Sequence, residues 1–103
     1  MDKQITFRSM DHSAAIENYI NEHIQRIEQF LANEKEPIFI AIVLEPSKTH
    51  AHHRVEVRVK SPEYDKICDF EGPEFYKLID KCLDTMLHNL REKKRELIDK
   101  RKS

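Results

Sequence analysis

Prolines and a single glycine between residues 37 and 73 limit where regular structure can form in this chain. The single glycine is residue 72, and the four prolines are residues 37, 46, 62 and 73. Gly and Pro are the strongest local signals for turns and for the ends of elements. Short elements are therefore expected between residues 37 and 73, with room for a helix on either side.

The stretch before Pro37 predicts a short strand followed by a helix. Residues 4–8 alternate between polar and apolar side chains, as a strand does. Ser13 is a good helix N-cap, and Glu17 in the first turn suits the helix dipole. Apolar side chains then recur every three or four positions, which predicts an amphipathic helix over residues 14–32.

Three strands are expected between the prolines. Residues 38–44 are apolar on both faces, which is typical of a central strand. Residues 52–60 alternate strictly, with valines on one face and charged side chains on the other. A further strand is predicted from about residue 64 to residue 71, with Cys68 and Phe70 on one side.

The end of the chain predicts a long helix opened by Gly72 and Pro73, because proline is tolerated in a first helical turn. Its apolar side is expected to comprise Phe75, Tyr76, Ile79, Leu83, Met86, Leu90 and Leu97. The fold class is thus α+β with the order β-α-β-β-β-α. We expect a four-stranded mixed sheet with both helices on one face. The 103 residues suit one domain over residues 1–99, with a basic tail at 100–103 that is expected to fray.

Charge is distributed unevenly along the chain. The formal net charge is −1, but residues 1–87 carry −5 and residues 88–103 carry +4. Opposite the apolar side of the last helix lie Lys77, Lys81, His88, Arg91 and Arg95, with Lys94 on the flank. Such a row could neutralise RNA phosphates. Charge alone does not decide this, because any solvated helix has a charged face and acidic residues interrupt this one.

Other site chemistries are weakly supported. His50 and His52 would point to one side of an extended segment and suggest a metal site, but no third ligand stands at a diagnostic spacing, and a solvated polar segment that includes His53 is the commoner explanation. There is no Gly-rich phosphate loop and no nucleophile motif. We therefore expect no enzyme activity, no cofactor and no small-molecule substrate.

The sequence favours a cytoplasmic protein. No apolar run approaches the roughly 20 residues that a membrane helix needs, and the N-terminus leads directly into the first strand, so no membrane partner and no signal peptide are expected. Cys68 and Cys82 match no CxxC spacing and are expected to be buried thiols in a reducing compartment.

Element order and several motifs resemble the ribosome hibernation promoting factors, also called the ribosome-associated inhibitor or sigma-54 modulation family. The resemblance spans nearly the whole chain, from the Ser13-capped helix through the Thr49-His50 turn and the valine strand. Its most specific part runs from Glu71 to Asp80 (EGPEFYKLID), followed by Asp84, Leu90 and Lys93-Lys94. The ending resembles the short form, which lacks the dimerisation domain of longer members.

This resemblance implies a layout like that of double-stranded-RNA-binding domains. It also implies docking on rRNA of the small ribosomal subunit, in the channel of tRNA and mRNA, and inhibition of translation during stress or stationary phase. Other hibernation factors would be further partners. Carried over by position, the RNA-facing candidates are Arg26, Lys81, Arg91, Lys93, Lys94 and Arg95.

Two observations qualify that reading. Where relatives commonly carry more basic residues, this chain has His23, Thr85, His88, Glu92 and Glu96, which predicts weaker binding and a shallower salt dependence. An alternative function is a homodimeric interaction module without RNA binding. It would use an uncovered face of the central strand, formed either by Phe39, Ala41 and Val43 or by the isoleucines between them.

Overall fold

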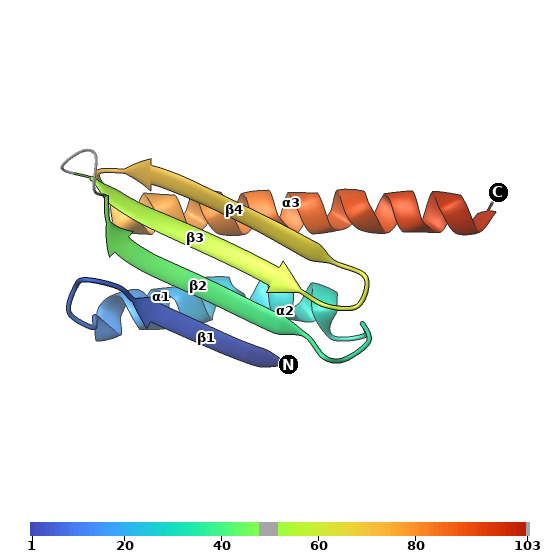
Figure 1. Ribbon diagram of the computed structural model, residues 1–103, viewed down its shortest axis with the longest axis horizontal. Helices are drawn as coiled ribbons and strands as arrows, with labels where there is room; N and C mark the ends of the chain where they lie inside the picture. The colour runs from blue at the N-terminus through green and yellow to red at the C-terminus, as the bar shows by residue number, and fades with distance from the viewer. Residues whose placement is uncertain (48–51, 103) are drawn as a thin grey trace.

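The computed structural model describes residues 1–47 and 52–102, with side chains to residue 101. Its elements are β1 (Asp2–Phe7), α1 (Ala14–His23), α2 (Gln25–Leu31), β2 (Phe39–Pro46), β3 (His53–Lys60), β4 (Asp65–Gly72) and α3 (Phe75–Lys102). The strands form one sheet in the order β1-β2-β3-β4, with β1 parallel to β2 and the other pairs antiparallel. All the helices lie on one side of the sheet (Figure 1). The predicted fold class is confirmed.

Register places the apolar sets of the strands on the face that the helices cover. Val55, Val57 and Val59 of β3 are at most 1% exposed, as their alternation predicts. In β2, Ile40 and Ile42 are equally buried, whereas Phe39 points the other way and is 47% exposed. The core therefore lies between sheet and helices, and the outer face of the sheet is open.

The helix predicted over residues 14–32 is divided into α1 and α2 at Ile24. The Ile24 N–H donates to the carbonyl of Ile20 at 2.8 Å, while its own carbonyl accepts from Ile27 at 3.0 Å and Glu28 at 3.1 Å. The Ile27–Ile24 bond is of the 3₁₀ type, so the helix is locally narrower here, but α2 continues in the direction of α1. Ile20, Ile24 and Ile27 remain on one face, each at most 1% exposed, so the expected apolar face survives the break.

The predicted cap of the first helix is present. The Ile16 N–H donates to Ser13 Oγ at 3.2 Å, and Ser13 has extended backbone angles. Replacing Ser13 with alanine leaves this N–H without its partner, and we expect a loss of about 0.5–2 kcal/mol in the free energy of unfolding. Urea denaturation followed by circular dichroism measures this loss. An unchanged midpoint would show that the cap contributes nothing.

Helix α3 begins at Phe75, two residues after Pro73, so the expectation that proline opens its first turn is wrong. Gly72 still ends β4, and a Cβ at this position would lie 3.1 Å from Leu78 Cδ2. At 1.5 Å per residue the 28 residues of α3 span about 42 Å. The helix ends at Lys102, so it includes three of the four residues of the expected tail, and it projects well beyond the sheet (Figure 1).

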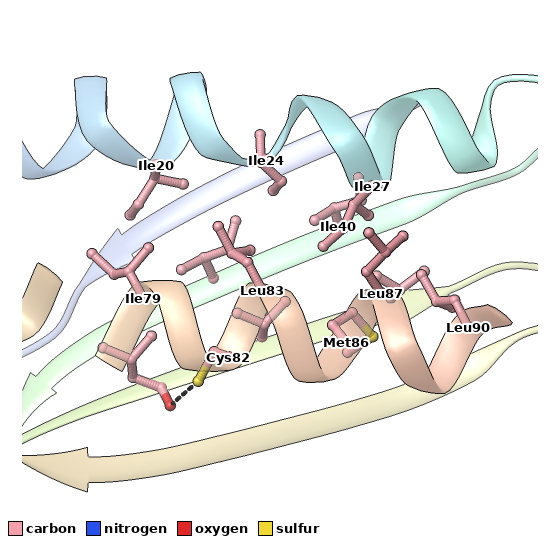
Figure 2. Packing of buried hydrophobic residues seen from close by; sticks show 14 of the residues in the cluster. Ile20, Ile24, Ile27, Ile40, Ile79, Cys82, Leu83, Met86, Leu87 and Leu90 are labelled. Atoms are coloured by element: carbon pink, nitrogen blue, oxygen red, sulfur yellow. Dashed lines mark hydrogen bonds between the residues drawn. The ribbon is translucent and has the colours of Figure 1, made fainter. Parts of the chain in front are cut away.

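Side chains of α1, α2 and α3 meet in the core between the helices and the sheet. Figure 2 shows Ile20, Ile24 and Ile27 directed from α1 and α2 toward α3, where Leu83 and Leu87 face them. On the sheet side of α3, Cys82 Sγ donates to the carbonyl of Val55 at 3.3 Å. Cys82 is fully buried, as expected, whereas Cys68 is only partly buried. These contacts fix the rotation of α3, and so they determine which of its side chains face solvent.

Candidate nucleic-acid interface

The outer face of α3 carries most of the predicted RNA-binding residues. Lys77 and Arg95 lie nine residues before and after the buried Met86, so at about 100° per residue they point directly away from it. On α3, six predicted residues are exposed: Lys77, Lys81, His88, Arg91, Lys94 and Arg95. Lys93 differs, because it lies on the same side of the helix as Met86 and its side chain is only 30% exposed. The structure thus brings the six exposed residues onto the solvent side of one rigid helix.

Several of these cations are paired with carboxylates. Lys77 Nζ lies 3.2 Å from Glu74, and Arg95 Nη1 lies 3.2 Å from Glu92. Lys93 Nζ lies 3.8 Å from Glu96. The partners in each pair are three residues apart in the sequence, and such exposed pairs contribute little to stability. They nevertheless cancel positive charge that phosphates would otherwise meet.

The predicted residue outside α3, Arg26, also has a carboxylate partner. Arg26 of α2 pairs with Asp84 of α3, and both side chains are more than half exposed, at 57% and 64%. The sequence shows Asp84 only as an interruption of the basic face. Its partner stands 58 residues away along the chain, so no local spacing could reveal the pair.

Three of the predicted cations remain, and we call Lys81, Arg91 and Lys94 the unpaired triad. Within residues 1–47 and 52–101, none of them forms an ion pair with a carboxylate at 4.0 Å or less. Lys81 Nζ stands 4.4 Å from the centre of the Phe70 ring, and Lys94 Nζ stands 5.3 Å from that of Phe30. A ring face attracts a cation without cancelling its charge. The triad is therefore the part of the face with the strongest attraction for phosphate.

An aromatic cluster that sequence reasoning missed joins α1 to α3. Tyr19 stacks on His23 with ring centres 3.9 Å apart and meets Tyr76 edge-to-face at 4.8 Å. Its hydroxyl donates to Asp80 Oδ1 at 2.6 Å. Tyr76 is 44% exposed, so its expected place on the apolar side is wrong: it covers Tyr19 at the rim of the core. The cluster fixes the N-terminal half of α3 against α1.

The hydrogen bond to Asp80, with burial, raises the pKa of Tyr19 from its ordinary value near 10 to about 12. A pKa that is higher in the folded chain adds stability below pH 10, and this contribution disappears as the pH rises from about 10 toward 12. We expect urea midpoints of the unmodified chain to fall more between about pH 9 and about pH 11 than those of Tyr19→Phe. Equal losses in the two proteins would contradict the assignment. Tyr64, whose pKa burial also raises to about 12, is present in both and contributes equally.

The histidine segment gives no support to the metal alternative. His50 lies outside the described residues, and no group of three or more possible ligands is found within residues 1–47 and 52–102. His53 stacks on Phe75 with ring centres 4.0 Å apart. That contact joins the start of β3 to the start of α3, which is a packing role.

The outer face of the sheet carries charges of both signs, and several of them pair with each other. Arg54 contacts Glu56 at 2.8 Å, Asp69 at 2.7 Å and Glu45 at 2.9 Å, and hydrogen bonding, above all to Glu56, raises the pKa of Arg54. The largest apolar side chains exposed on this face are Phe39 and Ile67, at 47% and 57%. The set formed by Phe39, Ala41 and Val43 is therefore the one that the helices leave uncovered. This face offers phosphate little net attraction.

The comparisons with known proteins identify a family by its sequence model and a fold by solved structures. A family model described as sigma 54 modulation protein / S30EA ribosomal protein matches residues 3–98. Among solved structures, the Thermus thermophilus Protein Y N-terminal domain superposes with a TM-score of 0.71 at 18% identity, covering 86% of this chain and 93% of that chain. A ribosomal subunit interface protein from Coxiella burnetii gives 0.73 at 22% identity, with coverages of 92% and 99%.

At such identities the two structures establish the shared fold alone. None of the curated proteins matches the sequence. Across the described part of the chain, no helix has the length and apolarity required to span a bilayer.

Proposed function

The chain belongs to the sigma 54 modulation protein / S30EA ribosomal protein family, and we propose that it binds the small ribosomal subunit and inhibits translation there. In this proposal the folded domain occupies the channel that tRNA and mRNA use, and the outer face of α3 contacts rRNA phosphates. The protein acts in the cytoplasm by steric exclusion, without covalent chemistry. One structural neighbour supports a ribosomal location, since it is itself described as a ribosomal subunit interface protein.

The unpaired triad carries this proposal. Lys81 and Lys94 are 13 positions apart on α3, which is about 20 Å along the helix axis. Counterions released from an RNA backbone by such charges provide the main free energy of a contact that needs no base readout. Core contacts hold α3 in place from Phe75 to Leu97, so the helix backbone that carries all three cations needs little reordering on binding.

Competition with tRNA tests the proposed location. Small ribosomal subunits are first incubated with the protein and then with labelled tRNA and a short mRNA, and bound tRNA is counted on filters. We expect saturating protein to prevent most tRNA binding and to inhibit translation in a cell-free extract. Protein and tRNA bound together at full occupancy would contradict the proposed channel.

A further inference from the structure

Asp84 interrupts the outer face of α3 between Lys81 and His88 and holds a cation of another element. Its Oδ1 contacts Arg26 Nη2, and the pair bridges α2 and α3 on the solvent side of the helical layer. The carboxylates paired with Lys77 and Arg95 differ, because each lies only three residues from its cation along the chain. Asp84 therefore limits what α2 can contribute to the surface.

Both members of this pair are accessible to a ligand. With 57% of Arg26 and 64% of Asp84 exposed, water surrounds the contact and a phosphate oxygen could reach the guanidinium. Arginine binds phosphate through two parallel hydrogen bonds when its fork is free. While Asp84 is bound to the Arg26 guanidinium, an approaching phosphate must displace the Asp84 carboxylate and is repelled by its negative charge.

We propose that Asp84 is an affinity-limiting residue that withholds Arg26 from RNA. It keeps the interface close to the three contacts of the unpaired triad, and Arg26 adds a fourth phosphate contact only when Asp84 releases it. This inference rests on the proposed function, since it concerns the same RNA-binding face.

Binding of Asp84→Asn to purified small ribosomal subunits tests the inference. One added phosphate contact should strengthen binding about five- to eightfold at about 0.1 M salt, and it should steepen the plot of log affinity against log salt by about 0.7–0.9. In a chain that also carries Arg26→Gln, Asp84→Asn should improve affinity at most about twofold, because the cation it releases is gone.

Asp65→Asn is the matched control. It removes the same charge and releases Arg58 in the same way, since Arg58 Nη2 lies 3.3 Å from Asp65 Oδ1, but it does so on the outer face of the sheet. We expect its affinity to equal that of the unmodified chain. An equal gain in Asp65→Asn would assign the effect to net charge and overturn the inference, as would a full gain that persists with Arg26→Gln.

The same assay separates this inference from the proposed function. If the unmodified chain binds and Asp84→Asn binds equally or more weakly, the inference alone is overturned, because the pair then positions Arg26 for RNA or leaves it irrelevant. If neither protein binds small subunits at about 50 mM salt, where phosphate contacts are strong, the proposed function is wrong and the inference is wrong with it. Thermal melts of every variant show that each is folded.

Discussion

Changing Lys81, Arg91 and Lys94 together to glutamate is expected to abolish co-sedimentation with small ribosomal subunits. Each lost phosphate contact weakens binding about five- to eightfold at about 0.1 M salt, so losing all three weakens it at least about 100-fold. Charge reversal adds repulsion to that loss. The side chains of Lys81, Arg91 and Lys94 are exposed, so the fold should persist. Sedimentation through a sucrose cushion measures the binding, and circular dichroism of the free protein measures whether the fold persists.

A second triple variant controls for net charge. Arg8, Arg58 and Lys60 are exposed and belong to the outer face of the sheet or its edge. Changing them to glutamate alters the net charge equally but leaves the helical face intact, and we expect sedimentation with ribosomes to persist. If this control loses binding while the α3 variant keeps it, the interface lies on the sheet instead.

Leu83→Ala is expected to cause the largest loss of stability. Leu83 is 2% exposed and lies where α3 faces Ile20 and Ile24 (Figure 2). Truncation removes buried methyl groups and leaves a cavity, which typically costs about 2–5 kcal/mol. For a domain of this size each kcal/mol lowers the melting temperature by about 4–8 °C, so a fall of at least about 10 °C is expected in a calorimetric scan.

Ile98→Ala is its control on the same helix. Ile98 is 39% exposed, near the end of α3 that projects beyond the sheet. Its truncation should lower the melting temperature by no more than a few degrees. If Ile98→Ala destabilises the chain as much as Leu83→Ala, the projecting end of α3 is packed in a way that the fold does not show.

Periodicity was sufficient to predict the elements, because burial on one face imposes a repeat on the sequence. The apolar run of residues 38–44 predicts a central strand, and β2 lies inside the sheet. The alternation of residues 52–60 predicts a strand with one covered face, and the valines of β3 are buried. The break at Ile24 could not be foreseen. Its apolar side chain keeps the helical spacing, and only one backbone hydrogen bond departs from the α pattern.

The candidate site was predictable only as a helix face. Spacing along α3 indicates which side chains point away from Met86, and those residues are exposed in the structure. Contacts between side chains of different helices produce no such periodic pattern in the sequence. Asp84 looks like an interruption until Arg26 is seen beside it, and the hydroxyl of Tyr19 meets Asp80 across 61 residues of chain. Which cations of α3 and α2 are paired and which are unpaired can therefore be learned only from the tertiary structure.

The salt dependence of binding to purified small subunits tests the central claim most directly. The unpaired triad predicts saturable binding whose log affinity falls with log salt at a slope of about −2 to −3 between about 50 mM and about 200 mM salt. The α3 triple variant should lose both the affinity and the slope. Saturable binding that does not change across this salt range, or no binding at its lower end, would contradict an interface made by Lys81, Arg91 and Lys94 with rRNA phosphates.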